Sequence, residues 1–276
     1  MSRIKARFAE LKSQGRGALI PYLEAFDPDL GTSQAILRGM PAAGADLIEI
    51  GMPFSDPMAD GPTIQAAAIR GLKAGATVRG TLTMVREFRA EDQATPVVLM
   101  GYLNPILSYG PEVFCTDAAE AGVDGLIVVD LPAEEADLLA PFAAQRGIDI
   151  IRLVAPTTDD ARLPHVLEGS SGFVYYISIA GITGTGTGTS AHLAAAIPRL
   201  RAVTDLPIAI GFGIRTPDQV AGAVAVADAA VVASSLINIL AASLDDQGRA
   251  RETTASSVLA EVARLAARLR SQEHLA

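Results

Sequence analysis

Residue types that carry several common chemistries are absent or scarce in this 276-residue sequence, which has no tryptophan, one cysteine and three histidines. The single cysteine, Cys115, excludes an internal disulfide and is typical of a protein from a reducing compartment. It falls in a helical pattern, so we interpret it as a small core residue. No secretory signal is visible, and we expect a cytoplasmic protein.

Lysine and histidine are too sparse for two classes of mechanism. None of the three lysines lies at the end of an apolar run, so a Schiff-base mechanism has no nucleophile. The histidines are far apart and form no cluster with carboxylates, so no catalytic metal is predicted. These residues are Lys5, Lys12, Lys73, His165, His192 and His274.

The net charge of −9 disfavours a nucleic-acid partner, and it requires any phosphate site to be built largely from backbone N–H groups. A membrane span is also not expected. Residues 220–243 are nearly all apolar, but Asp228, Ser234, Ser235 and Asn238 interrupt them, and their middle resembles a short strand between helices. What remains is acid–base chemistry by carboxylates.

Eight short apolar runs alternate with helical patterns along the chain. This order predicts parallel βαβ units in one domain over residues 1–276, folded as a (β/α)8 TIM barrel. Ile4, Phe8 and Leu11 add an amphipathic N-terminal helix. An open doubly wound sheet is the alternative, although no G-x-G-x-x-G follows the first run. The runs are residues 18–22, 47–50, 97–100, 125–129, 148–154, 173–178, 208–210 and 229–233.

The chain is organised around residues 47–61, LIEIGMPFSDPMADG, which read as a buried strand and the loop that follows it. Glu49, Asp56 and Asp60 lie in this stretch, at the end of a barrel strand where such folds place their chemistry. A desolvated Glu49 is suited to proton transfer, and a buried ion pair or hydrogen-bond network is its alternative role. On these residues alone, Asp60 is better interpreted as a turn or helix-capping residue, and Asp56 as a turn former.

Two later loops complete the predicted barrel mouth. Residues 181–190, GITGTGTGTS, cannot bury apolar area, so we expect a mobile loop that is either a lid or a plain connector. The glycines of GFGI at 211–214, and Ser235 at the start of a helix, follow the seventh and eighth runs. That is the common phosphate site of these barrels, although the glycines alone could simply turn the chain.

The sequence resembles the tryptophan synthase alpha-chain family over essentially its whole length. The resemblance rests on LIEIGMPFSDPMADGPTIQ at 47–65, PVVLMGYLNPI at 96–106, VVDLP at 128–132, GITG at 181–184, and GFGI with ASS at the phosphate end. It implies a retro-aldol cleavage of indole-3-glycerol phosphate to indole and glyceraldehyde 3-phosphate. In that reaction, Glu49 moves protons to C3 of the ring and from the glycerol hydroxyl, and Asp60 binds the ring N–H.

The same resemblance implies further site residues and a partner. Tyr22, Ile64, Leu99, Leu126 and Phe212 are expected to hold the ring; Tyr102 and Tyr175 to lie near the site; Gly184, Gly213, Ser234 and Ser235 to bind phosphate; and Thr183 to position Asp60. No cofactor is expected in this chain, because pyridoxal phosphate belongs to a beta subunit in an αββα assembly. A stand-alone lyase that releases indole and a catalytically weak regulatory homologue are the alternatives.

The sequence departs from the family pattern in three places. Phe26 stands where the family usually has glycine, Glu24 lies near a usually smaller residue, and Ser234 replaces a glycine of the phosphate turn. The N–H group of Ser234 survives, so phosphate binding is expected to survive as well, unless its φ is positive.

Overall fold

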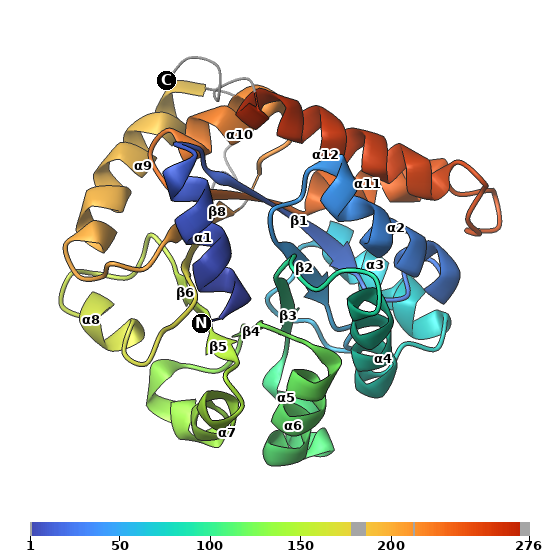
Figure 1. The fold of residues 1–276 in the computed structure, drawn as a ribbon, viewed down its shortest axis with the longest axis horizontal. Coiled ribbons are helices and arrows are strands. Elements are labelled where there is room, and N and C mark those ends of the chain that lie inside the picture. The colour runs from blue at the N-terminus through green and yellow to red at the C-terminus, as the bar shows by residue number, and fades with distance from the viewer. Residues whose placement is uncertain (1, 178–185, 212, 271–276) are drawn as a thin grey trace.

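A computed structural model of the chain describes residues 2–177, 186–211 and 213–270. Its strands form one parallel sheet encircled by helices (Figure 1). The strands are β1 (Ala18–Glu24), β2 (Ile48–Gly51), β3 (Val97–Gly101), β4 (Gly125–Val128), β5 (Asp149–Ile150), β6 (Arg152–Val154), β7 (Val174–Ile177), β8 (Ile208–Gly211) and β9 (Ala229–Val232).

The sheet closes on itself as a barrel. Its strand order is β5-β4-β3-β2-β1-β9-β8-β7-β6, and Ile151 alone separates β5 from β6, so both ends of this order belong to one stretch of chain. All eight predicted runs are therefore barrel strands, the fifth of them in two pieces. The barrel prediction is confirmed and the open sheet is excluded.

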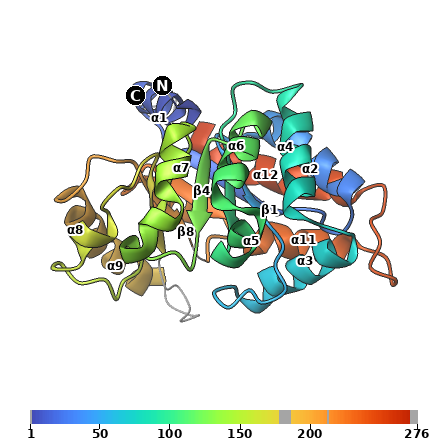
Figure 2. The same cartoon turned by 90° about the horizontal axis from the view of Figure 1, so that it is seen from below.

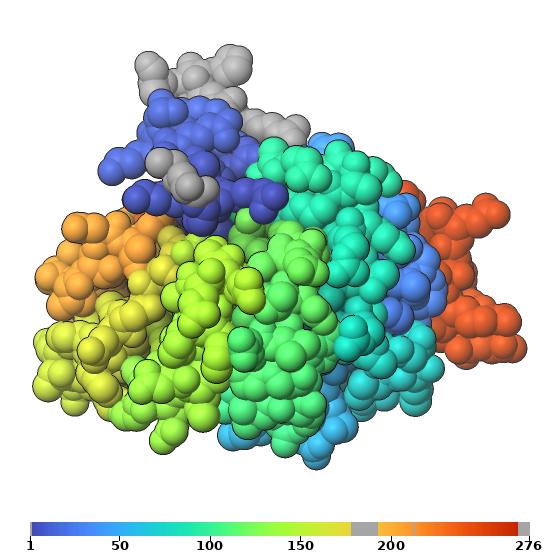
Figure 3. Space-filling view, turned by 60° about the horizontal axis from the view of Figure 1, so that its bottom comes forward, coloured from blue at the N-terminus to red at the C-terminus, as the bar shows by residue number. Residues whose placement is uncertain are grey.

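Helices cover the outside of the barrel in sequence order, and Figure 3 shows successive segments side by side on the surface, from yellow through green to cyan. They are α1 (Arg3–Ser13), α2 (Leu30–Ala43), α3 (Pro62–Lys73), α4 (Val78–Arg89), α5 (Leu103–Tyr109), α6 (Pro111–Ala121), the 3-10 helix η1 (Ala133–Leu138), α7 (Ala140–Gln145), α8 (Leu163–Val166), α9 (Gly186–Arg201), α10 (Pro217–Val224), α11 (Ser234–Ser243) and α12 (Thr254–Arg270).

Alternating side chains divide the core into two parts. Ala18 and Ile20 of β1 point into the barrel, whereas Leu19 and Leu23 of the same strand pack outward against the helices. The predicted N-terminal helix is confirmed as α1, whose Ile4, Phe8 and Leu11 are buried in the interior cluster. Figure 2 shows α1 at one end of the barrel, opposite the end where α3 and α5 lie.

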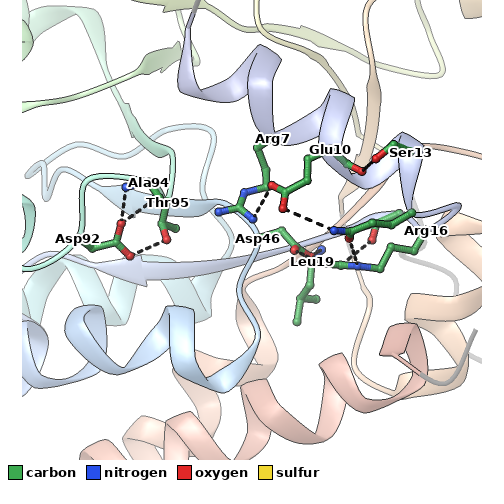
Figure 4. A network of polar contacts seen from close by, with 11 residues as sticks. Arg7, Glu10, Ser13, Arg16, Leu19, Asp46, Asp92, Ala94 and Thr95 are labelled. Carbon is green, nitrogen blue, oxygen red and sulfur yellow. Dashed lines mark hydrogen bonds and ion pairs between the residues drawn. The ribbon is translucent and has the colours of Figure 1, made fainter. Parts of the chain in front are cut away.

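Ion pairs hold the amino-terminal ends of the strands. Asp46, just before β2, receives both terminal nitrogens of the Arg16 guanidinium at 2.8 and 2.9 Å, and it accepts the N–H of Leu19 at 2.9 Å. Figure 4 shows this contact with the neighbouring Asp92–Thr95 turn. The network joins the segment before β1 to the segment before β2.

Two helical details differ from the prediction. α5 was not predicted, although its Pro105 lies in the first turn, where proline is tolerated. The predicted loop 181–190 lies in part outside the described residues, but from Gly186 onward the chain already belongs to α9. The low helix propensity of Gly and Thr favoured a loop in the prediction. In the structure, the helix begins before the apolar pattern that predicted it.

The apolar stretch 220–243 is divided among α10, β9 and α11. Within the described part of the chain, the structure contains no helix that is both long and apolar enough to span a bilayer.

Candidate active site

Glu49 points into the barrel. Its neighbours Ile48 and Ile50 belong to the outer core, so the alternation along β2 turns Glu49 to the interior, above Leu47. The β1–β2 register places it beside Tyr22, and the residue is 1% exposed. A carboxyl group therefore lies among the inward-facing residues of the barrel, at the second of the four residues of β2.

The environment of Glu49 favours its protonated form. Its Oε2 atom is buried and has no hydrogen-bond partner among the described residues. Burial, and to a lesser degree the charge of Asp60, raise the pKa of Glu49 to about 8. The alternative of a satisfied ion pair or hydrogen-bond network does not match this geometry. A carboxyl group with such a pKa holds its proton at neutral pH and can give it up during a reaction.

Asp60 lies on the loop after β2 and is half-buried. Its pKa is raised by burial, and a hydrogen bond with the Tyr102 side chain partly offsets this effect. The Tyr102 hydroxyl also accepts the N–H of Ala59 at 3.0 Å, which ties the loop to the turn after β3. The N-cap of α3 is Gly61, without a side-chain cap, so Asp60 does not cap this helix.

A small cavity lies beside Asp60, and Glu49 is not among the residues that line it. Tyr22, Asp60 and Tyr102, all predicted, face the same space, whereas Glu24 and Met100 were not predicted as site residues. The side chains and backbone that line it are those of Tyr22, Glu24, Gly51, Met52, Phe54, Asp60, Ala68, Met100, Gly101, Tyr102 and Val129.

The structure corrects two of the predicted ring-binding residues. Leu99 and Leu126 are fully buried, but they belong to the core between the strands and the helices. Their neighbours Met100 and Ile127 face the barrel interior instead. Successive side chains of a strand point to opposite faces, so a shift of one position changes which residue faces the interior. The prediction considered only whether the side chains were apolar.

Ile64 and Tyr175 do lie near the site. Ile64, on α3, packs with Tyr22 and Met100 in one apolar cluster. Tyr175, on β7, is 6% exposed, and burial together with the charge of Glu49 raises its pKa well above the ordinary value. The hydroxyl of Tyr175 therefore faces the same interior space as Glu49.

The predicted phosphate end is built around the start of α11. Ser234 and Ser235 are its first two residues, and the N-cap Ala233 supplies no side-chain cap. The Oγ atom of Ser235 is buried and has no partner among the described residues. Ile237 and Ala233 belong to the same cluster as Tyr22, so the helix start adjoins the ring side of the site. Unpaired N–H groups at a helix N-terminus favour an anion.

The backbone agrees with the expected phosphate turn. Gly213 has φ 79°, a conformation that glycine adopts without strain. Phe26 is the one residue other than glycine with positive φ in the described part of the chain, so the φ of Ser234 is not positive and its N–H stays in helical geometry. Thr183, Gly184 and Phe212 lie outside the described residues.

Two departures from the family pattern have structural consequences. Phe26, at φ 65°, occupies the left-handed region that explains why glycine is usual there. Glu24 is 2% exposed, and its inward direction follows from the alternation in β1, a signal that was present in the sequence. Burial above all raises the pKa of Glu24 to about 8.

A cation site has no support in the described residues, where no group of three or more His, Cys, Asp or Glu side chains could hold a metal ion. Cys115 is buried in α6, which confirms its interpretation as a core residue.

Comparisons with known proteins identify close relatives. A model of the family described as tryptophan synthase alpha chain matches residues 8–267. Proteins of that description from Granulibacter bethesdensis and Gluconacetobacter diazotrophicus are 67% and 68% identical over 271 residues, which cover 98% of this chain and 97% and 99% of theirs. The crystal structure of tryptophan synthase subunit alpha from Legionella pneumophila superposes with a TM-score of 0.89 at 35% identity, covering 98% of this chain and 99% of that one.

Proposed function

This chain belongs to the tryptophan synthase alpha-chain family, and on that premise we propose that Glu49 and Asp60 carry out its lyase reaction, the cleavage of indole-3-glycerol phosphate. The observation that carries the assignment of residues is Glu49, a buried carboxyl group without a hydrogen-bond partner among the described residues, inside the barrel mouth. The enzyme is a carbon–carbon lyase of tryptophan biosynthesis.

Glu49 serves as acid and then as base. Its proton passes to C3 of the indole ring, which turns the ring into a leaving group with a positive charge. The resulting carboxylate takes the proton of the glycerol hydroxyl as the bond between C3 and the glycerol carbon breaks. The electron pair of that bond returns to the ring, and the products are indole and glyceraldehyde 3-phosphate. Glu49 ends protonated, so the cycle is balanced.

Asp60 stabilises the positive charge that forms on the ring. Its carboxylate accepts a hydrogen bond from the indole N–H, and the contact with Tyr102 holds the loop that carries it. A negative charge placed where positive charge develops lowers the barrier of that step. The two acids therefore have separate roles, which their different surroundings support.

The rest of the substrate is held by less polar groups and by backbone. Tyr22 and Ile64 enclose the ring together with Met100 and Val129, in place of Leu99 and Leu126. Tyr175, which interacts with the charge of Glu49, is assigned to the reacting end of the ring. Gly213, Ser234 and Ser235 bind the phosphate. Gly184 as a further phosphate contact, Phe212 as a ring-binding residue and Thr183 as the residue that positions Asp60 are assigned by the family resemblance alone, because they lie outside the described residues.

We propose a cytoplasmic enzyme that acts with a tryptophan synthase beta subunit in an αββα assembly, in which pyridoxal phosphate is bound by the partner. Turnover of indole-3-glycerol phosphate by the purified chain, alone and with added beta chain, tests this proposal. Large activation supports the subunit role, high activity alone supports a stand-alone lyase, and no cleavage under either condition contradicts the enzymatic role and favours a regulatory homologue.

A further inference from the structure

Glu24 is a third carboxyl group at the barrel mouth, and the mechanism above gives it no role. It is the last residue of β1, it is 2% exposed, and it lines the same cavity as Asp60. A buried acid is costly unless its neighbours compensate for it. The contacts of Glu24 show what it does.

The Tyr22 hydroxyl donates a hydrogen bond to Oε2 of Glu24. The two side chains meet above Gly51, where an added Cβ would lie 1.9 Å from the Tyr22 hydroxyl and 2.5 Å from Glu24 Oε2. The β1–β2 register pairs Tyr22 with Glu49 and Glu24 with Gly51. The backbone of Tyr22 therefore lies beside that of Glu49, but its hydroxyl is directed to Glu24, the next inward-facing residue along β1 toward the mouth.

Glu49 lacks the hydrogen bond that this phenol could supply. Its Oε2 atom has no partner among the described residues. The titratable groups that face it are Tyr22 from β1, Tyr175 from β7 and Asp60 from the following loop. A hydroxyl that donated to Glu49 would favour the ionised carboxylate and so weaken its ability to protonate carbon.

We propose that Glu24 is a positioning residue for the lyase reaction: by accepting the hydrogen bond of the Tyr22 hydroxyl, it keeps that donor away from Glu49. Glu49 then keeps its proton at neutral pH without a competing partner. The inference rests on the proposed function of Glu49 as the proton donor.

The charged groups around Glu24 are compatible with this role. Asp60 and Asp27 disfavour its ionisation, whereas Tyr22 and Arg70 favour it. Burial outweighs both, so Glu24 remains mostly neutral at pH 7 and adds little negative charge next to Asp60. Its main effect on Glu49 is therefore the direction of the Tyr22 hydroxyl.

The test is a titration of Glu49 in variants that remove the acceptor of this hydrogen bond, Glu24, either with or without its donor, the Tyr22 hydroxyl. Glu24→Ala removes the acceptor, Glu24→Gln keeps a carbonyl acceptor, and Tyr22→Phe combined with Glu24→Ala removes both partners. The pKa of the Glu49 carboxyl is followed by NMR on protein carrying ¹³C-labelled glutamate, with Glu49→Gln as the assignment reference. If Glu24→Ala does not fold, Glu24→Val removes the acceptor with less loss of volume.

We expect Glu24→Ala to lower the pKa of Glu49 by about one unit, the size of effect that one new hydrogen bond to a carboxylate produces. Glu24→Gln and the double variant should both titrate like the wild type. A matched control is Asp117→Ala, which removes the acceptor of another tyrosine hydroxyl, that of Tyr109, between α5 and α6. This variant should leave the pKa of Glu49 unchanged. An unchanged pKa in Glu24→Ala, or a lowered pKa that persists in the double variant, overturns the proposal.

Kinetics separate this proposal from the proposed function. The alkaline limb of kcat/KM for indole-3-glycerol phosphate should move toward lower pH in Glu24→Ala, and return in the double variant. The NMR pattern without any cleavage would mean that the positioning is right and the assigned reaction is wrong. Cleavage without the NMR pattern would mean the reverse.

Discussion

The two ends of the barrel treat their carboxyl groups in opposite ways. At the amino end, Asp46, Asp124 and Asp228 each precede a strand and pair with an arginine. Each also accepts an N–H group of the preceding strand, at 2.7 to 2.9 Å. At the carboxyl end, the acids that line or underlie the cavity are Glu24, Glu49 and Asp60.

No arginine or lysine pairs with these three acids among the described residues, and their pKa values are raised. Acidic side chains therefore join strands at one end of the barrel, whereas at the other end Glu49 is proposed to hold a transferable proton. What differs is the presence of a cationic partner, since a paired carboxylate stays ionised whereas an unpaired buried one keeps its proton.

Removing the ionisable group of Glu49 should have the largest effect. Glu49→Gln is nearly isosteric and is expected to lower kcat by about 10³- to 10⁴-fold. This is the upper part of the range of about 10²- to 10⁴-fold for general acid–base catalysis, because Glu49 serves as both acid and base. Steady-state assays with indole-3-glycerol phosphate measure the loss, and circular dichroism and substrate binding serve as controls for the fold. Activity retained in this variant contradicts the proton-transfer assignment.

Breaking the amino end should affect stability and leave chemistry intact. Asp124→Asn leaves the buried Arg89 without its charge partner, which lies 2.7 Å away, and should cost about 3–5 kcal/mol of unfolding free energy. Urea denaturation measures this effect. The matched control is Asp160→Asn, because the ion pair of Asp160 with Arg199 is exposed and should cost less than about 1 kcal/mol. A fall in kcat of folded Asp124→Asn protein would contradict the assignment of stability to the amino end and of chemistry to the carboxyl end.

Asp60→Asn should reduce kcat by about 10²- to 10³-fold, the range found when one electrostatic stabiliser of a transition state is removed. The residue is half-buried and does not cap α3, so its loss should change the melting temperature little. Rate measurements together with thermal unfolding decide between the two roles. A lower melting temperature with normal turnover would make Asp60 a structural residue like those of the amino end.

The carboxyl end of the barrel also contains a residue with a strained backbone. Phe26, two residues after the end of β1, has φ 65° and is 8% exposed, with its ring against Gly80. Phe26→Gly relieves about 1–2 kcal/mol of left-handed strain but forfeits about 3–5 kcal/mol of aromatic burial. The expected result is a net destabilisation of about 2 kcal/mol by chemical denaturation. A more stable variant would show that strain outweighs packing at this position.

The last prediction concerns the pH dependence of stability. The folded-state pKa of Glu49 lies above its ordinary value of 4.5, at about 8, so its stabilising contribution is complete below pH 4.5 and is lost as pH rises through 8. Glu49→Gln cannot ionise and should lose less stability than the wild type between pH 5 and pH 9. Unfolding curves at both values test this difference. Identical losses in the two proteins would indicate an ordinary pKa.

The sequence was sufficient for the barrel because each strand is a continuous apolar run followed by a helical pattern. It was also sufficient to single out Glu49 as a buried carboxyl group, because a carboxylate inside an apolar run is costly unless it has a role. It was not sufficient to tell which side chains of a strand point into the barrel. Leu99 and Leu126 have suitable side chains, but each is one position away from an inward-facing residue.

Local contacts escaped prediction for a different reason. The Tyr22–Glu24 hydrogen bond occupies the space that the absent side chain of Gly51 leaves, and the register of β1 and β2 brings the three residues together. The arginine partners at the amino end likewise come from segments far apart in the sequence, as with Arg3 and Asp124. Such pairs follow from the closed fold and are not visible in residue patterns.

The most direct test of the central claim is the exchange of the C3 hydrogen of indole in D₂O, with glycerol 3-phosphate added to fill the phosphate site. In D₂O the Glu49 carboxyl carries deuterium, so it should deliver a deuteron to C3, and the resulting carboxylate should then remove the original C3 hydrogen. The wild type should therefore exchange this hydrogen far faster than the buffer does. Glu49→Gln should leave it at the buffer rate. Equal exchange rates in the two proteins would contradict the account.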